Sequence, residues 1–161
     1  MNQKKIANLG LFAAVAIIFG YVESLIQFFA GIPGMKLGLA NLAVLFILEK
    51  YTWKEAALVS AVRIIVIGFM FGNLFSILYS LAGAALSLTV MTFMKKKSGF
   101  SILGISVAGG VSHNIGQLII AGLITMTSGL IYYAPALLIS GVITGLLIGT
   151  LTGEVLKRIR F

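Results

Sequence analysis

The sequence predicts an all-α integral membrane protein, a bundle of six transmembrane helices. Of its 161 residues, 60% are hydrophobic and only 10% are charged, and the mean hydropathy is +1.11. These values lie far outside the range of soluble globular domains. A chain of 17.1 kDa that contains several helices of about 20 residues has no room for a separate soluble domain. We therefore expect a single transmembrane domain over residues 1–161.

Six apolar runs, bounded by charged residues or by Gly, Pro and Asn, are the predicted helices. They cover residues 5–29, 33–49, 54–71, 74–94, 101–127 and 133–156. The first run is too long for the apolar region of a secretory signal and lacks a convincing cleavage site, so we expect a retained helix. An even number of helices places both termini on one side of the membrane.

Basic residues indicate which side that is. Ten of the 12 lysines and arginines fall at the termini or in alternate loops: Lys4, Lys5, Lys50, Lys54, Lys95, Lys96, Lys97, Lys157, Arg158 and Arg160. Because positive loops stay inside, we expect a multi-pass protein of the cell membrane with both termini cytoplasmic. The formal net charge of +8 then reflects topology and contact with anionic lipid headgroups, so we expect no nucleic-acid partner. Glu49, Glu55 and Glu154 lie beside these cations, as expected for solvated ion pairs or interfacial anchors.

The sequence lacks the residues that several kinds of active site and metal site require. The chain has no cysteine, which excludes disulfides and thiolate metal sites, and a single histidine gives no metal cluster. It has no GxxxxGK[ST] loop for ATP hydrolysis and no aspartate to hold magnesium around a prenyl diphosphate. We therefore expect no enzyme activity, no cofactor and no metal.

Small residues mark helix-packing surfaces. In the last predicted helix a glycine recurs at every fourth position: Gly141, Gly145, Gly149 and Gly153. A ridge of this kind lets two helix backbones approach closely, either within the bundle or between subunits.

Glu23 is the one acidic residue away from the basic ends. It shares a face of the first helix with Ala13, Ala16, Gly20 and Gln27, at spacings of three and four. Arg63 is the only cation in the middle of an apolar run, where it costs at least about 2.5 kcal/mol on insertion scales. Arg63 therefore pairs with Glu23 or with helix carbonyls, or else binds a ligand.

The segment VSHNIGQL places three polar residues inside the fifth helix. His113 and Gln117 are four residues apart and share a face, while Asn114 lies about 100° around the helix. A lone membrane histidine often makes an interhelical hydrogen bond, and ligand binding is the alternative. Lys36 also has two interpretations: it is an anchor at the outer membrane interface, or it contacts the ligand.

Three segments carry a resemblance to a known family: YVESLIQFFAGIPGMKLGLANLAVLF, RIIVIGFMFGNLFSILYSLAGAALSL and GGVSHNIGQLIIA. They resemble the Gx transporter family, historically labelled heptaprenyl diphosphate synthase component I. That family is related to the substrate-binding S components of energy-coupling factor (ECF) transporters. The resemblance implies six helices, an outward-facing substrate site, and a separate scaffold and ATPase that supply energy.

The resemblance also implies roles for individual residues. The small residues of the first helix would dock on the scaffold subunit: Ala7, Gly10, Ala13, Ala14 and Ala16. The polar residues would surround the small-molecule substrate: Glu23, Gln27, Lys36, Asn41, Arg63, Asn73, His113, Asn114 and Gln117. The cations among them favour a ligand with an anionic or polar head, and outer phenylalanines could hold its apolar body: Phe28, Phe29, Phe69, Phe71 and Phe75.

Two functions remain open from the sequence. The first is the S-component-like subunit of an ECF-type transporter for a vitamin- or cofactor-like molecule, energised by a separate ATPase module. The alternative is a membrane binding or assembly protein for an isoprenoid quinone or prenyl lipid in an electron-transfer pathway. A prenyl-transferase component is the weakest reading, because the aspartates are missing.

Overall fold

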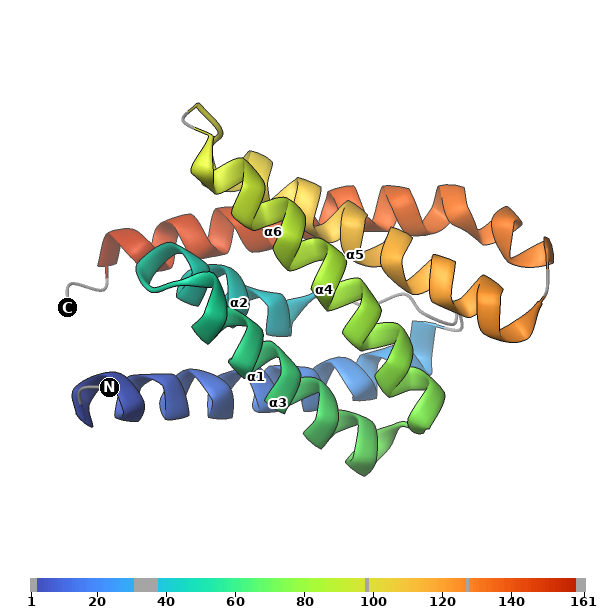
Figure 1. The fold of residues 1–161 in the computed structure, drawn as a ribbon, viewed down its shortest axis with the longest axis horizontal. Helices are drawn as coiled ribbons and strands as arrows, with labels where there is room; N and C mark the ends of the chain where they lie inside the picture. The colour runs from blue at the N-terminus through green and yellow to red at the C-terminus, as the bar shows by residue number, and fades with distance from the viewer. Residues whose placement is uncertain (1–2, 31–37, 98, 127, 159–161) are drawn as a thin grey trace.

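In a computed structural model, the described part of the chain forms six α-helices and one short 3₁₀ helix, η1 (Figure 1). The helices are α1 (Gln3–Ala30), α2 (Leu39–Lys50), α3 (Trp53–Phe71), α4 (Leu74–Lys96), α5 (Ile102–Thr125), η1 (Ser128–Tyr133) and α6 (Ala134–Arg158). The structure describes residues 3–30, 38–97, 99–126 and 128–158, and only the backbone of residues 27–30 and 128. The predicted all-α class and the order of its six helices are confirmed.

Four segments among the described residues are long and apolar enough to cross a membrane: Gln3–Ile26, Leu74–Lys96, Ile102–Thr125 and Gly129–Arg158. The prediction of a second full span over residues 33–49 is not met by α2, which has 12 residues. A helix of that length extends about 18 Å, against a hydrocarbon core of about 30 Å. Instead α2 is the most enclosed helix, and Leu45, Phe46 and Ile47 are among its fully buried side chains.

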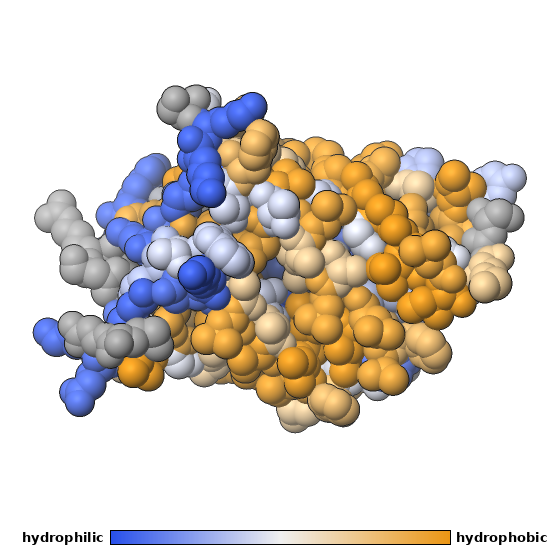
Figure 2. Space-filling view, viewed as in Figure 1, coloured by the Kyte–Doolittle hydropathy of each residue, from blue (hydrophilic) through white to orange (hydrophobic). Residues whose placement is uncertain are grey.

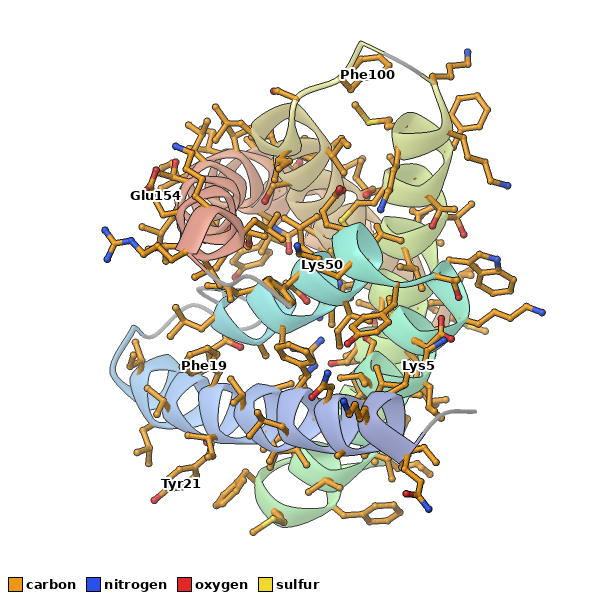
Figure 3. The ribbon with its side chains drawn as sticks, turned by 90° about the vertical axis from the view of Figure 1, so that its left-hand side faces the viewer. Lys5, Phe19, Tyr21, Lys50, Phe100 and Glu154 are labelled. Atoms are coloured by element: carbon orange, nitrogen blue, oxygen red, sulfur yellow. The ribbon has the colours of Figure 1, made fainter. Side chains whose placement is uncertain are left out.

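The helices form two groups that face each other. Helices α1, α2 and α3 pack on one another, while α5 packs between α4 and α6 and makes its most extensive contacts with both. Contacts of α3 with α4, and of α2 with α6, join the groups. In the view from one end, Phe19 lies on the side of α1 that faces α2, and Tyr21 lies on the opposite side (Figure 3). The short buried helix α2 therefore fills the space between α1 and the second group.

One end of the molecule is strongly polar. Both termini lie at this end, and hydrophilic residues gather there, while apolar residues cover most of the rest of the same face (Figures 1 and 2). The expected ion pairs are present: Lys95 Nζ lies 3.5 Å from Glu49 Oε2, and Lys157 Nζ lies 2.7 Å from Glu154 Oε1. We call this the basic end. The arrangement agrees with the predicted grouping of the termini and alternate loops on one side.

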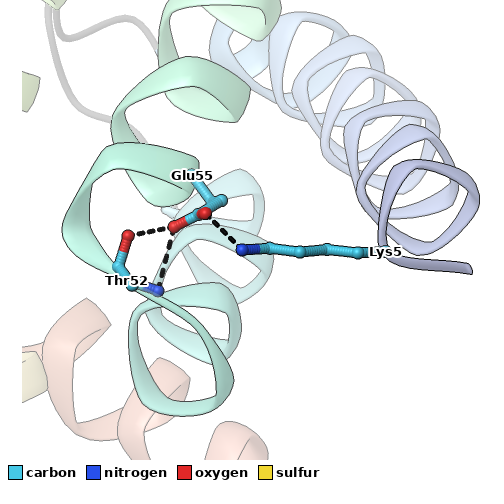
Figure 4. A network of polar contacts seen from close by, with 3 residues as sticks. All are labelled: Lys5, Thr52 and Glu55. Atoms are coloured by element: carbon cyan, nitrogen blue, oxygen red, sulfur yellow. Dashed lines mark hydrogen bonds and ion pairs between the residues drawn. The ribbon is translucent and has the colours of Figure 1, made fainter. Parts of the chain in front are cut away.

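A third ion pair at the basic end joins α1 to α3 (Figure 4). Lys5 Nζ lies 2.5 Å from Glu55 Oε1, and Thr52 donates its backbone N–H to Glu55 Oε2 at 3.1 Å. Glu55 lies in the first turn of α3, outside the four membrane-crossing segments. The hydrogen bond from Lys5, supported by that of the Thr52 hydroxyl, lowers the pKa of Glu55 to about 2. The pair ties α1 to α3.

The glycine ridge of α6 packs inside the bundle, against α5. A β-carbon added to Gly145 would lie 2.6 Å from Val107 Cα, and one added to Gly141 would lie 3.0 Å from the carbonyl carbon of Gly110. Gly149 is similarly close to Leu103 Cα, at 3.0 Å. Gly153 differs, because a β-carbon there would meet nothing within 4 Å. The packing surface therefore consists of the first three glycines, and the last lies in open space.

The small residues of α1 divide between two faces. Ala16 is fully buried and Ala13 packs against the core, so both face the interior. Ala7, Gly10 and Ala14 are exposed on the other side of the helix. This division follows from the 100° turn per residue. Ala16 is therefore inaccessible to a partner, and the outward surface that a partner could contact contains Ala7, Gly10 and Ala14.

Candidate functional site

A cavity of about 440 Å³ lies among the helices, in the half of the molecule away from the basic end. Its residues on α3 begin at Arg63, ten residues or about 15 Å beyond the start of that helix at the basic end. On α4 they occupy the opposite end, from Phe75 to Ser80. All six helices or their flanking residues contribute to the wall. We call this space the central cavity.

The central cavity brings together seven of the nine predicted substrate-binding residues. They are Glu23, Asn41, Arg63, Asn73, His113, Asn114 and Gln117. The predictions for Gln27 and Lys36 lie outside the described residues and side chains. Of the predicted aromatic residues, Phe71 and Phe75 line the cavity, and Phe69 is 76% exposed on the outer surface. The predictions for Phe28 and Phe29 also lie outside the described side chains.

Arg63 is buried in the wall of the central cavity, with only 9% of its surface exposed. Its Nη2 donates a hydrogen bond to Asn41 Oδ1 at 3.2 Å. Among the described residues, no ion pair joins Arg63 to Glu23, and Arg63 Nε is buried without a hydrogen-bond partner. Of the two structural explanations predicted for this arginine, the direct pair with Glu23 is therefore absent from the described residues.

Glu23 connects the cavity wall to the start of α2. Its Oε1 accepts a hydrogen bond from the backbone N–H of Leu39 at 2.9 Å. Gly38, directly before α2, has the left-handed value φ = 72°, which glycine adopts without strain. The first N–H groups of a helix have no partner within it and carry partial positive charge, so a carboxylate there is stabilised. Part of the role of Glu23 is thus to cap α2.

Glycines place the VSHNIGQL segment in the cavity wall. A β-carbon on Gly83 of α4 would lie 2.7 Å from the carbonyl oxygen of His113 and 2.8 Å from Gln117 Cγ. A β-carbon on Gly116 would lie 2.9 Å from the Ala82 carbonyl oxygen. The close approach of α4 and α5 therefore sets the positions of His113 and Gln117.

Asn114 and Asn73 line the cavity and also make local structural bonds. Asn114 Nδ2 donates to the Leu137 carbonyl oxygen at 2.6 Å, which links α5 to α6. Asn73 caps α4: its Oδ1 accepts from the Ser76 N–H at 2.8 Å, and its own N–H donates to Ser76 Oγ at 3.0 Å. Asn114 therefore joins α5 to α6 beside the cavity, and Asn73 fixes the first turn of α4.

Sequence reasoning missed several hydroxyl groups in the wall. They are Ser24, Ser76, Tyr79, Ser80 and Thr144. Ser76, Tyr79 and Ser80 follow the three- and four-residue spacing of one helix face, which was the available signal. The signal is weak, because membrane serines and threonines commonly bond their own helix, as Thr150 does with the Leu146 carbonyl oxygen at 2.8 Å.

The wall of the central cavity combines a guanidinium, a carboxylate, an imidazole, carboxamides and hydroxyls with aromatic rings. Such a surface offers hydrogen-bond donors and acceptors to a polar head and apolar contact to its body. A cavity of about 440 Å³ lies within the usual size range of ligand sites, about 300–1,000 Å³. The central cavity can therefore bind a small molecule selectively through these polar groups and aromatic rings.

The fold and the cavity define an α-helical membrane protein with a polar, partly open cavity among its helices. A family model described as heptaprenyl diphosphate synthase component I matches residues 12–155, and the chain belongs to that family. No curated protein and no solved structure matches the chain.

Proposed function

We propose that this chain is the substrate-binding membrane subunit of an ECF-type transporter, which takes up a small vitamin- or cofactor-like molecule. The observation that carries the proposal is the central cavity, into which helices α1 to α5 and their flanking residues bring seven of the predicted polar residues. Polar groups at membrane depth are costly unless they have partners, and a shared cavity lets them bond to one another and to a polar ligand. Several of these groups also bond to protein atoms, but Arg63 Nε is buried without a hydrogen-bond partner among the described residues, which a bundle built for stability alone would be expected to pair.

The direction of the cavity supports uptake. The basic end is the cytoplasmic side under the positive-inside rule, so the half that holds the central cavity is the outer half. A site in the outer half is accessible to molecules that arrive from outside the cell. In this proposal the chain lies in the cell membrane, and both termini are on its cytoplasmic side.

Energy comes from a separate module in this proposal. The sequence has no GxxxxGK[ST] nucleotide loop, and we propose that the chain itself is not an enzyme. Ala7, Gly10 and Ala14 are exposed small residues of α1, and a scaffold helix could approach the backbone of α1 closely at these positions. An ATPase bound to that scaffold would supply the energy.

Native mass spectrometry of the detergent-purified chain tests the binding role. The spectrum should contain a species heavier than the apo chain by the mass of one small molecule, and denaturation should release it. In liposomes, the chain alone should bind this molecule without accumulating it. Concentrative uptake by the isolated chain, with no ion gradient and no ATPase, would contradict the transport assignment.

A second candidate is a binding or assembly protein for a prenyl lipid or isoprenoid quinone in an electron-transfer pathway. The family description favours it, and implies a partner synthase component. Phe71 and Phe75 both line the cavity and are 46% and 53% exposed, so an isoprenoid tail could extend from the cavity toward lipid. This candidate predicts that the molecule released in mass spectrometry partitions into hexane and that no ATPase partner is needed.

A further inference from the structure

The charges in the wall of the central cavity bear on the class of ligand. Two formally charged side chains among the described lining residues face it, Glu23 and Arg63, and both are more than nine-tenths buried. The charge of Glu23 has a protein partner, because its carboxylate caps the N-terminus of α2 through the Leu39 N–H. Among the described residues, the hydrogen bond of Arg63 goes to the neutral amide oxygen of Asn41, and the carboxylate of Glu23 acts on its charge from nearby without a direct ion pair.

Arg63 also retains unused hydrogen-bonding capacity. A guanidinium has five N–H donors, and the bond from Nη2 to Asn41 uses one of them. Its Nε is buried without a partner among the described residues. Planar anions bind a guanidinium through two parallel hydrogen bonds, and such charge-assisted bonds are about twice as strong as neutral ones. A carboxylate in the cavity would fit this vacant edge.

Resting on the proposed binding function, we infer that the central cavity takes a ligand whose head is a singly charged carboxylate held by Arg63. The carboxylate of Glu23 in the same wall disfavours a diphosphate, because a second concentration of negative charge at close range is repelled. A neutral quinone head would give the buried guanidinium edge at Nε no charge-assisted hydrogen bond. Phe71, Phe75 and Tyr79 line the cavity beside this head and suit an aromatic body.

Matched probes test this inference on the intact, detergent-purified chain. Indole-3-propionate carries the carboxylate and an aromatic body, and indole-3-propionamide differs from it only by loss of the charge. Tryptamine reverses the charge, and geranyl diphosphate supplies a polyanion. We expect indole-3-propionate to raise the melting temperature more than each of the other three, because a ligand stabilises the state that it binds.

Two variants test whether Arg63 is the residue that binds the carboxylate. Arg63→Gln should weaken the affinity for indole-3-propionate by about tenfold or more, the usual loss for a charge-assisted bond, and should leave indole-3-propionamide unaffected. Lys96→Gln, which removes an exposed cation at the basic end, should change neither. The comparison of the four probes on the unaltered chain does not depend on the folding of Arg63→Gln.

The outcomes separate this inference from the proposed function. If the amide, tryptamine or geranyl diphosphate stabilises the chain as much as the carboxylate does, the ligand class is wrong while the binding role stands. If none of the four changes the melting temperature and no small molecule co-purifies, both the ligand class and the binding role fail.

Discussion

Gly83 of α4 and Gly116 of α5 pack directly against one another: a β-carbon added to Gly116 would lie 2.9 Å from Gly83 Cα. Gly83 also contacts the His113 backbone, so the packing of α4 on α5 fixes where the VSHNIGQL segment lies along α5 and which way it faces. The site thus depends on two residues that have no side chain to contact a ligand.

Gly116→Ala should destabilise the fold by about 1–3 kcal/mol, because the new methyl group meets backbone atoms that cannot move aside. Gly122→Ala is the matched control on the same helix, since a β-carbon there meets nothing within 4 Å. Replacing an unconstrained helical glycine by alanine should stabilise by about 0.5–1 kcal/mol. Thermal melting in one detergent compares the two variants, and equal shifts would show that α4 and α5 are farther apart.

Gly145→Leu should lower folded yield and melting temperature, because Val107 Cα occupies the space into which the side chain would extend. Gly153→Leu, on the same helix, should be tolerated, since its surroundings are open. Size-exclusion chromatography and melting of both variants provide the measurement. Normal stability of Gly145→Leu would mean that the glycine ridge faces lipid.

The sequence was sufficient to predict the helices and most of the polar wall. Apolar runs of 17 or more residues located all six helices, and for the four long apolar segments the reason is that the bilayer sets their length, whereas α2 is shorter than its run. Polar residues such as Arg63 and His113 stood out because few side chains carry charge or hydrogen-bonding groups at that depth. Polar groups at membrane depth are costly without partners, and this cost predicted that they gather around one cavity.

Other features depended on tertiary contacts. The shortness of α2 arises from the turn at Gly38 and from the cap that Glu23 provides across 16 residues of sequence. The partner of Arg63 was predicted as Glu23 or carbonyls and is the side chain of Asn41. Local spacing cannot reveal such pairs, because they lie on different helices. The spacing of the glycine ridge likewise does not show which helix packs against it, and in the structure that helix is α5.

Single-cysteine labelling tests the topology, and the absence of native cysteines gives a clean background. A cysteine at Tyr132, which is 85% exposed in η1 at the end opposite the basic end, should react with an impermeant maleimide added to intact cells. A cysteine at Lys96 should react only after the membrane is permeabilised. External labelling at position 96 would reverse the assigned orientation.

Acid should weaken the link between Lys5 and Glu55. The pKa of Glu55 is lowered to about 2 in the folded chain, against about 4.3 when unfolded, so its stabilising effect is present above pH ~4.3 and is lost as the pH falls toward 2. Glu55→Gln should lower the melting temperature at pH 7 and flatten its decline below pH ~5. Lys5→Gln should give a similar profile, and curves parallel to that of the unaltered chain would show that the pair contributes nothing.

The most direct test of the central claim measures both affinity and stability for His113→Ala and Gln117→Ala. Each variant should bind the co-purifying molecule more weakly by roughly 1–3 kcal/mol, because a polar group of the bound molecule loses its partner. Melting of the ligand-free protein should stay nearly unchanged, since both side chains line the cavity. A lower melting temperature with unaltered affinity in the folded fraction would contradict the account and make the VSHNIGQL segment a structural element of the bundle.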